Sequence, residues 1–467
     1  MDNKKEQLYA RYRQIVEEEA KNRSSVGIAF SQSEEKANEV FVKIRNEVQN
    51  DPSINLFRNL LKIKSVLEAT RIYNVIAKMP KGILHHTHLP ATMSKELFME
   101  LTHGDNVYYN RAKGVLKIGT ESMNLGKEGF TRLNALRDEE GKEKVDLEVR
   151  ALVTFTKESF DKRDVDVIFA SFSTPFVAMG DVIYYKPNFS RLLDDVVESL
   201  IRDGFQGGEL RHVFGLVVKE DYTKASLDEE LDIIAKEQER IALKYPGFAL
   251  SFIATSLKIL DRQHFLDMAH MYARSLEKYP GLVSAYDMVH FESTRMLDEY
   301  IDDILDLQSK YKDFKVLLHA GETYSHSNNN MIIAVLLGSK RIGHGVTALR
   351  STTKLNLLRD HDVCIEVNPF SNYLLGYVRD LKWHPAKQLI NHGVPFTLNS
   401  DDNMLWDVEV GSFDFMLAAL YWDFDLRDLK WCILNSFKYA SIDAGRVQKA
   451  REVFETNWNM FIEHMNA

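Results

Sequence analysis

The sequence predicts an α/β fold, a (β/α)8 TIM barrel with an N-terminal helical arm and a small insertion after the first strand. From residue 80 onward, eight short apolar runs alternate with longer amphipathic segments, as eight parallel strands separated by helices require. Histidines and carboxylates stand at the C-terminal ends of several runs, where such barrels place their active sites. A chain of 467 residues with 45% hydrophobic content can bury a core of that size.

Residues 1–78 are predicted to form a helical arm ahead of the barrel, which is assigned to residues 79–467. Leu8, Tyr12 and Ile15 recur at helical spacing. Ser31 and Glu34 have the spacing of a capping box, which starts a second helix. Such an arm either packs on its own barrel or mediates oligomerisation, and the pattern alone leaves both open.

The eight strand-like runs are short and apolar, and the segments between them have helical periodicity. They span Gly82–His88, Gln206–Val213, Ala249–Ser256, Leu282–Val289, Lys315–Ala320, Arg341–Gly345, Asp362–Asn368 and Pro395–Ser400.

Residues from about 104 to 147 interrupt this alternation. Tyr108, Tyr109 and the run Gly114–Gly119 indicate a short β excursion, and a charged stretch follows it. We interpret this segment as an insertion after the first strand that can roof the pocket. A disordered loop is the alternative interpretation.

Composition excludes several classes of protein. The formal net charge of −9 gives no general basic surface for nucleic acid. Only Cys364 and Cys432 are present, which excludes a disulfide-dense secreted scaffold. Neither an apolar run of membrane-spanning length nor a signal-peptide pattern is visible. We therefore expect a cytoplasmic protein that acts on a small molecule, with no nucleic-acid or membrane partner.

Four of the residues at the strand ends form a set of candidate metal ligands. In His86-Thr87-His88 both imidazoles point to one side, because strand side chains alternate with a period of two. A third nitrogen from His319 and a carboxylate from Asp401 complete four ligands suited to Zn²⁺, one ion per chain. His85 is expected to point to the opposite face and is left out of the set.

Three further residues are candidates for the chemistry beside the metal. Glu322 lies three residues past His319, so its carboxylate can act as a general acid beside the ion. His344 is positioned to orient or deprotonate a water molecule. Asp402 follows Asp401, and we expect it to point away from the metal and to bond substrate or water. Metal ligands with a general acid and a water-orienting histidine beside them are typical of a metal-dependent hydrolase.

These motifs carry a resemblance to a known family. The chain resembles the adenosine deaminases of the amidohydrolase superfamily, and more narrowly the adenosine deaminase-related growth factor or adenosine deaminase 2 subfamily. The motifs are Met79-Pro80-Lys81-Gly82, His86-Thr87-His88, Glu209-Leu210-Arg211, His319-Ala320-Gly321-Glu322, Arg341-Ile342-Gly343-His344-Gly345, Ile365-Glu366-Val367-Asn368-Pro369-Phe370-Ser371-Asn372 and Ser400-Asp401-Asp402.

The resemblance implies a reaction and a role for each residue. Adenosine or 2′-deoxyadenosine is deaminated to inosine or 2′-deoxyinosine and ammonia, with zinc held by His86, His88, His319 and Asp401. It implies that Glu322 protonates purine N1, that His344 positions the hydroxide that attacks C6, and that Asp402 contacts N7. Glu292 is a further substrate-contact candidate. In the subfamily the N-terminal helices build a homodimer, which favours dimerisation for the arm.

Two departures from the family pattern concern the sugar end of the pocket. Where relatives carry an aspartate that contacts the ribose 5′-hydroxyl, this chain has Leu89 and Pro90, which offer no side-chain acceptor. Where typical deaminases place a glycine against purine N3, this chain has His290, which we count among the substrate-contact positions. The sequence therefore predicts that apolar 5′ substituents are tolerated.

Alternative functions remain open. Within enzymes they are a deaminase of a 5′-modified adenosine, of adenine or of AMP, and AMP is the least supported because no phosphate-cradling loop or arginine cluster is visible. From another class, the chain is a catalytically silent dimeric signalling or binding protein. Every proposed ligand is present, which favours the enzyme.

Overall fold

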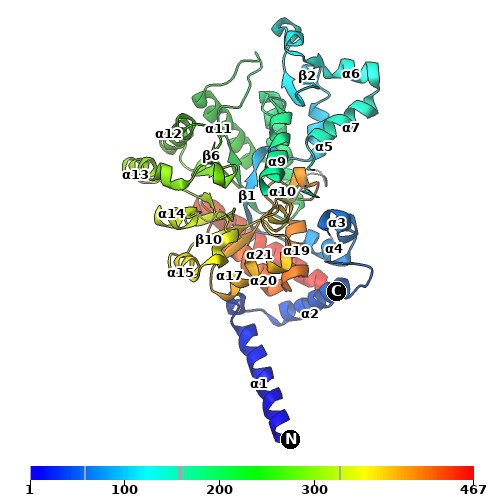
Figure 1. Cartoon of the computed structure of the whole chain (residues 1–467), viewed down its shortest axis with the longest axis vertical. Helices are drawn as coiled ribbons and strands as arrows, with labels where there is room; N and C mark the ends of the chain where they lie inside the picture. Colours follow the sequence, from blue (N-terminus) through cyan, green and yellow to red (C-terminus); the bar gives the residue numbers. More distant parts are fainter. Residues whose placement is uncertain (1, 57–58, 156–159, 162–163, 325–327) are drawn as a thin grey trace.

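The computed structural model describes residues 2–56, 59–155, 160–161, 164–324 and 328–467, and a parallel β-barrel lies at its centre (Figure 1). The barrel strands are β1 (Ile83–His88), β5 (Gly207–His212), β6 (Ala249–Leu257), β7 (Val283–Val289), β8 (Leu318–Ala320), β9 (Arg341–His344), β10 (Cys364–Val367) and β11 (Phe396–Leu398). Each falls within, or within one residue of, a strand-like run of the sequence, so the predicted (β/α)8 barrel is confirmed.

The strands form two four-stranded parallel sheets that close on each other. Their orders are β1-β5-β6-β7 and β11-β10-β9-β8. Parallel bridges between Thr87 and Asp401 and between Tyr286 and Val316 join the sheets at both seams. Almost every strand residue is buried, as expected where a barrel interior lies on one side and helices cover the other.

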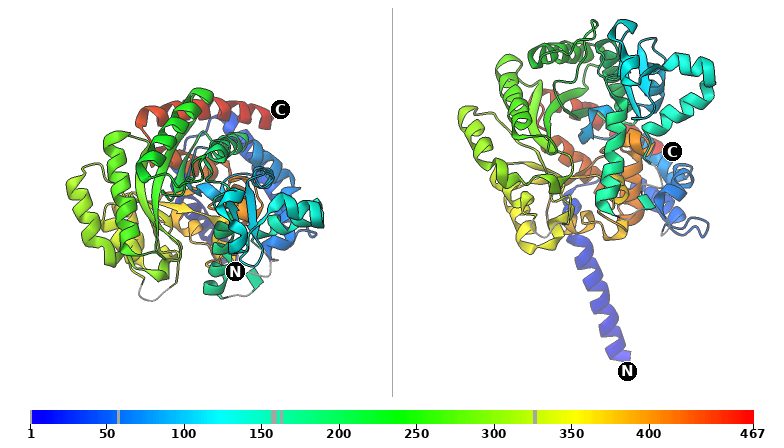
Figure 2. Two further views of the ribbon diagram at one scale, coloured as in Figure 1. Left: turned by 90° about the horizontal axis from the view of Figure 1, so that it is seen from above. Right: turned by 45° about the horizontal axis from the view of Figure 1, so that its top comes forward.

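Helices follow the strands and pack around the barrel, as Figure 2 shows from above. Those between the strands are α10 (Lys186–Arg202), α11 (Leu227–Lys244), α12 (Arg262–Lys278), α13 (Ile301–Lys310), α14 (Asn330–Leu336), α15 (Thr352–Asp360), α16 (Pro369–Leu374) and α17 (Ala386–Asn391). After the last strand come α18 (Asn403–Trp406), α19 (Ser412–Trp422), α20 (Leu426–Lys438) and α21 (Ala444–Asn466).

The segment predicted as a helical arm, residues 1–78, is helical in the structure. It contains α1 (Asp2–Lys21), α2 (Gln32–Gln49), α3 (Leu60–Glu68) and α4 (Arg71–Lys78), and α2 and α4 pack against the C-terminal helices α19 and α21 or each other. The predicted capping box of Ser31 and Glu34 is present at the start of α2. Phe41 and Ile44 of α2 are buried in the main hydrophobic core, so the same chain covers these two side chains. Helix α1 projects from the body of the molecule (Figures 1 and 2).

The predicted insertion is ordered rather than a disordered loop. After β1 and α5 (Lys95–Leu101) the chain forms a small antiparallel sheet of β2 (Val107–Asn110), β3 (Val115–Ile118) and β4 (Thr131–Arg132), followed by α6 (Leu133–Glu140) and α7 (Lys142–Leu152). Next comes α9 (Val165–Met179), which contacts β3. A Cβ on Gly180, whose φ is +53°, would lie 1.8 Å from the carbonyl oxygen of Leu116, so only glycine allows this contact.

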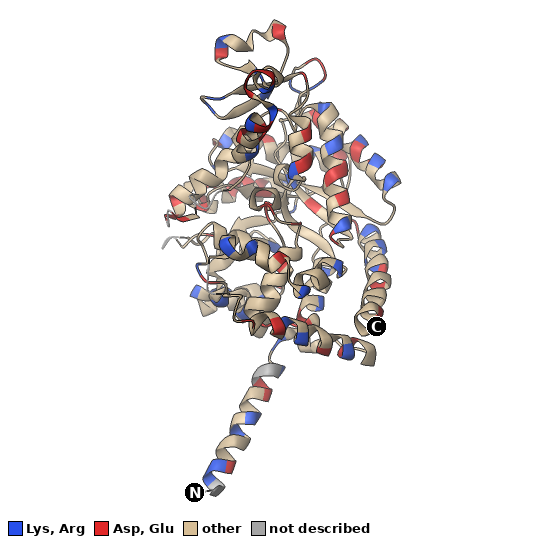
Figure 3. Cartoon of the chain, turned by 90° about the vertical axis from the view of Figure 1, so that its right-hand side faces the viewer, with Lys and Arg blue, Asp and Glu red and all other residues tan. Residues whose placement is uncertain are grey.

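On the side drawn in Figure 3, basic and acidic residues are interspersed along the helices, including α1. Among the described residues, no helix combines the length and apolar character that a membrane crossing requires.

Candidate active site

The predicted ligands meet at the C-terminal ends of the barrel strands. The Nε2 atoms of His86 and His88 both lie 3.3 Å from Oδ1 of Asp401. The ring of His319 is 4.6 Å from that of His86, centre to centre. His344, at the end of β9, has its ring 4.7 Å from that of His86 and 5.0 Å from that of His319. The structure therefore brings together all the residues that the sequence selected as ligands.

The donor set fits a metal ion. Nitrogen atoms of His86, His88 and His319 lie within 4.8 Å of one another, as do ligand atoms of His86, His344 and Asp401. Nε2 of His86 is buried and has no hydrogen-bond partner among the described residues. A buried imidazole nitrogen without a partner is costly unless something binds it, and three imidazoles with a carboxylate are a ligand set suited to zinc.

Buried carboxylates orient two of these imidazoles from behind. Glu366 Oε2 lies 2.8 Å from Nδ1 of His86, and Asp287 Oδ2 lies 2.7 Å from Nδ1 of His319. Although burial alone raises the pKa of Glu366 and of Asp287, the positive groups beside them hold each pKa well below its usual range. An ionised carboxylate only accepts, so each Nδ1 donates and each Nε2 is left with a lone pair for a metal.

The charges of these carboxylates are balanced inside the barrel. Arg211 donates to Asp287 over 2.8 Å and to Glu366 over 2.7 Å. Arg341 donates to Glu366 over 2.7 Å and, through both terminal nitrogens, to Glu209. All five side chains are buried. Buried charges persist only when they are paired and hydrogen-bonded, so this network orients the two imidazoles without leaving an unpaired charge.

His85 points to the opposite face of β1 from His86 and His88, as the alternation of strand side chains predicts. Its Nε2 lies 2.7 Å from the carbonyl oxygen of Ser436, a residue of α20 outside the barrel. The carbonyl only accepts, so His85 donates there. The side chain therefore points away from the cluster, as the sequence predicted.

The expectation that Asp402 points away from the metal ligands is wrong. Strand β11 ends at Leu398, and Asp401 has a left-handed backbone with φ +60°, so the alternation of strand side chains no longer holds. A carboxylate oxygen of Asp402 lies within 4.8 Å of ligand atoms of His88 and Asp401. Both oxygens of Asp402 are buried without a hydrogen-bond partner among the described residues. Burial and the neighbouring Asp401 raise the pKa of Asp402 well above its usual value.

Glu322 lies beside this cluster. Its Oε1 is 3.5 Å from Nε2 of His344, and its side chain is 5% exposed. Burial, with the charges of Glu292 and Asp401, raises the pKa of Glu322 well above its usual value. A carboxyl group that keeps its proton in a buried site can act as a general acid.

Glu292 is hydrogen-bonded to the segment that carries Glu322. Its two oxygens accept hydrogen bonds from the main-chain N–H groups of Gly321 and Thr323, at 2.7 and 2.8 Å, and from the side chain of Asn330 at 3.0 Å. With these acceptor positions occupied, Glu292 holds the turn that carries Glu322. This position supports the acid, and the substrate contact that the resemblance implied for Glu292 stays a prediction.

Helix α9 supplies aromatic contacts at the C-terminal ends of the barrel strands. Phe169 of α9 packs edge-on against the ring of His290, and Phe172 stacks on Trp406 of α18. The backbone of His290 is left-handed with φ +82°, and its Nδ1 is buried without a partner among the described residues. Two further polar atoms, Nζ of Lys258, which follows β6, and Nε1 of Trp406, are also buried without a hydrogen-bond partner among the described residues. Such buried polar atoms favour a polar ligand at this end of the barrel.

Sequence reasoning gave no role to the orienting network. Glu209, Arg211, Asp287 and Glu366 stand inside otherwise apolar strands. In a parallel barrel that is buried on both faces, such residues have to be paired inside the molecule. Charged residues in the middle of buried strands are therefore the signal that identifies the network.

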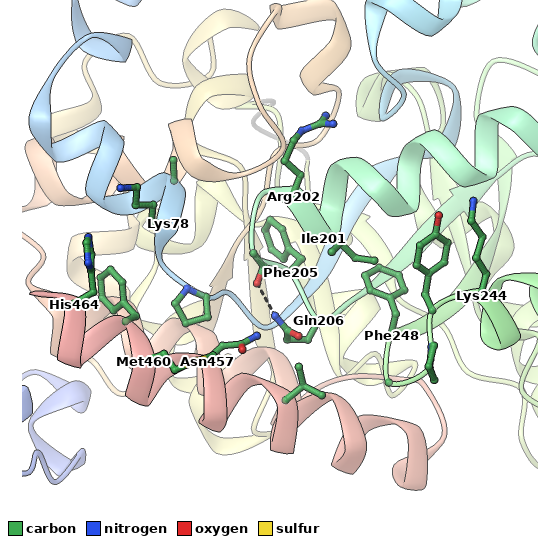
Figure 4. Close-up of a pocket in the computed structure, with 18 residues that line it drawn as sticks. Lys78, Ile201, Arg202, Phe205, Gln206, Lys244, Phe248, Asn457, Met460 and His464 are labelled. Carbon is green, nitrogen blue, oxygen red and sulfur yellow. Dashed lines mark hydrogen bonds between the residues drawn. The ribbon is translucent and has the colours of Figure 1, made fainter.

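A large cavity lies at the opposite end of the barrel (Figure 4). It has a volume of about 830 Å³ and is lined by residues before the strands, including Pro80, Gln206 and Phe248, and by α21. Its lining contains neither the histidine cluster nor Glu322. Because barrel enzymes carry their chemistry at the C-terminal ends of the strands, the histidine cluster, and not this cavity, is the candidate active site.

Comparisons with known proteins agree with this geometry. The family model described as adenosine deaminase matches residues 143–456. Adenosine deaminase of Lutzomyia longipalpis is 27% identical, over 100% of this chain and 95% of its own length. Adenosine deaminase 2 of Dictyostelium discoideum is 25% identical, over 97% of this chain and 86% of its own length. An amidohydrolase of Burkholderia ambifaria with bound Zn has the same fold, with a TM-score of 0.62 and 16% identity, over 84% of this chain and 94% of that structure.

Proposed function

The chain belongs to the adenosine deaminase family of hydrolases, and on that premise we propose that it hydrolyses adenosine or 2′-deoxyadenosine to inosine or 2′-deoxyinosine, with release of ammonia. The observation that carries the proposal is the position of the buried Glu322 beside the cluster of His86, His88, His319 and Asp401. An acid next to a metal-ligand set is what hydrolytic removal of an amino group from a purine requires.

We propose that His86, His88, His319 and Asp401 hold one zinc ion. The unpartnered Nε2 of His86 and the carboxylates behind His86 and His319 support this assignment. When bound, zinc lowers the pKa of a coordinated water molecule so that a nucleophile is available at neutral pH.

Three side chains around this set act on the purine and on the attacking water. Glu322 donates its proton to purine N1, which makes C6 more electrophilic. Asp402, which keeps its proton because its pKa is raised, donates to N7 and fixes the plane of the base. His344 lies 3.5 Å from Glu322 and 4.0 Å from Asp401, so it is placed to orient the attacking water. As its oxygen bonds to C6, the attacking water gives up two protons: one restores the proton that Glu322 gave to N1, and the other leaves with the 6-amino group as ammonia.

A panel of purines tests the proposal. Ammonia release is measured with adenosine, 2′-deoxyadenosine, 5′-methylthioadenosine, adenine and AMP, each over a range of concentrations. We expect the two unmodified nucleosides or the methylthio derivative to have the highest kcat/KM. A preference for adenine or AMP would replace the proposed substrate, and no release from any of the five would support a catalytically silent protein.

A further inference from the structure

A hydrogen-bonded chain leads from the main chain at Ala386 to the catalytic face of the barrel. The N–H of Ala386 donates to Nδ1 of His384 over 3.1 Å. Because a main-chain N–H can only donate, Nδ1 of His384 is an acceptor and the hydrogen of this imidazole lies on Nε2. His384 is 1% exposed, and burial lowers its pKa to about 3, which is consistent with a neutral ring.

The chain continues through the side-chain amide of Asn372. Nε2 of His384 lies 3.0 Å from Oδ1 of Asn372, and Nδ2 of Asn372 lies 3.0 Å from Nδ1 of His344. The hydrogen on His384 requires an acceptor, so the oxygen of the amide faces His384 and its NH₂ group faces His344. An amide nitrogen only donates, so Nδ1 of His344 accepts.

A second amide reaches the same atom from an independent anchor. Nδ2 of Asn368 lies 3.3 Å from the carbonyl oxygen of Glu366 and 3.2 Å from Nδ1 of His344. The carbonyl can only accept, so the NH₂ group of Asn368 is held on this side. Two donors of separately fixed orientation therefore converge on one nitrogen of His344.

We propose that His384 and Asn372 are positioning residues that, together with Asn368, fix His344 as the neutral tautomer with its hydrogen on Nε2. The assignment follows from the donor and acceptor roles of the four groups and needs no ion in the site. With Nδ1 engaged as an acceptor and Nε2 carrying the hydrogen, His344 has no free lone pair.

The consequence for catalysis rests on the proposed function. Nε2 of His344 faces Glu322 and Asp401, which is where the attacking oxygen has to lie. His344 therefore donates a hydrogen bond to that oxygen and directs its lone pair toward C6. It does not remove a proton from the water, so the sequence-based alternative of deprotonation by His344 is excluded by the tautomer.

Nuclear magnetic resonance tests the tautomer directly. Zinc-loaded protein labelled with ¹⁵N in histidine is compared with the His344→Gln variant to assign the two ring nitrogens of His344. We expect Nδ1 to show the chemical shift of an unprotonated nitrogen and Nε2 that of a protonated one. The opposite pattern, or two protonated nitrogens, would overturn the inference. Ammonia release decides the proposed function separately, because the tautomer does not depend on substrate.

Two variants test the chain of hydrogen bonds. In Asn372→Asp an ionised carboxylate accepts from both histidines, so the hydrogen of His344 moves to Nδ1 while His384 keeps its tautomer as an internal control. Loss of one oriented donor costs about 10²–10³ in kcat, and we expect that loss with KM and zinc content unchanged. His384→Phe keeps a ring beside Trp422 but frees the Asn372 amide. Because Asn368 remains, we expect a smaller loss in kcat, of about tenfold.

The outcomes are distinguishable. Asn372→Asp with the wild-type tautomer of His344 and wild-type kcat would refute the inference. A purely structural role for Asn372 would lower the melting temperature and raise KM while leaving the signals of His344 in place, which also contradicts it.

Discussion

Nδ1 of His86 donates to Oε2 of Glu366 over 2.8 Å, and neither residue is exposed to solvent. The contact fixes which nitrogen of His86 faces the cluster. It also ties a residue at the C-terminal end of β1 to one in β10, on the far side of the barrel seam. The strands are thus linked through the site as well as through their main-chain hydrogen bonds.

Replacing Glu366 with Gln is expected to weaken metal binding. Gln can turn its NH₂ group toward His86, which removes the acceptor for Nδ1, and loss of such an outer partner costs about 10–100-fold in metal affinity. Glu209→Gln is the matched control, because Glu209 bonds Arg341 in the same network but contacts none of the proposed ligands. Competition with a zinc chelator measures both. Equal affinities in the two variants would show that the contact with His86 has no special role.

Glu322→Gln should separate catalysis from metal binding. Gln has nearly the same shape but no carboxyl proton for purine N1, and general acid catalysis is worth about 10²–10⁴ in rate. We expect kcat to fall by that factor while the zinc content stays at one ion per chain. Steady-state kinetics and metal analysis check the two parts. A variant with kcat close to that of the wild type would place the acid on another residue.

Glu34 links α2 to the C-terminal helices in a pH-dependent way. Burial alone raises its pKa, but hydrogen bonds from Lys430, Ser31 and Trp458 lower it to about 2. The folded pKa is thus below the unfolded value of about 4.3, so the stabilisation is complete above that pH and is lost as the pH falls toward 2. Because the group is partly exposed, we expect Glu34→Gln to lower the free energy of unfolding at pH 7 by about 1–2 kcal/mol.

Urea titration at several pH values measures this difference. The gap between Glu34→Gln and wild type should shrink steadily below about pH 4. Glu35→Gln is the control, because Glu35 bonds Arg427 at a more exposed position, with 49% of its side chain accessible. A gap that is the same at every pH would mean that packing, and not charge, accounts for the effect of the substitution.

The strands and the ligand set could be predicted from the sequence because both depend on local pattern. Apolar runs of strand length and histidines at their ends are visible residue by residue, and a closed parallel barrel allows few other arrangements. The direction of Asp402 could not be predicted, because the left-handed backbone of Asp401 (φ +60°) breaks the alternation that the argument assumed.

The surface that covers the helices before the barrel, and the hydrogen bonds of Glu292, could not be predicted for a different reason. An apolar stripe such as Phe41 and Ile44 requires a partner surface, but the pattern does not say whether that surface belongs to the same chain. Glu292 has the residue type of a substrate contact. Only the positions of the Gly321 and Thr323 amides show that its oxygens are already engaged.

A homodimer through the N-terminal helices stays a prediction, and α1 is a helix of this segment with an exposed apolar stripe. Its residues Leu8, Tyr12 and Ile15 are 64, 60 and 48% exposed, and an apolar stripe of this kind favours a partner surface. We expect the full chain to form a homodimer and a variant that begins at Arg23 to be a folded, active monomer. Light scattering coupled to size exclusion measures the masses. A monomeric full chain at micromolar concentration, or a truncated chain that still forms dimers, would assign α1 another role.

The last prediction concerns the 5′ end of the substrate. Leu89 and Pro90 follow β1 in a short helical turn that contacts α18, and Leu89 is fully buried. Neither side chain accepts a hydrogen bond, so a ribose 5′-hydroxyl gains no partner from the position where the family resemblance implies an aspartate. Removing that hydroxyl should therefore cost little, and we expect kcat/KM for 5′-deoxyadenosine to be within about tenfold of that for adenosine.

Leu89→Asp is the matched variant for this prediction. It supplies an acceptor at the first of the two positions, and a buried hydroxyl left without a partner costs roughly 1–3 kcal/mol. The ratio of kcat/KM for adenosine to that for 5′-deoxyadenosine should therefore rise by one to two decades in the variant, provided that its melting temperature shows a folded protein. A wild-type ratio above about a hundredfold would contradict the prediction. It would show that another group, such as the unpartnered Nε1 of Trp406 in α18, already bonds the hydroxyl.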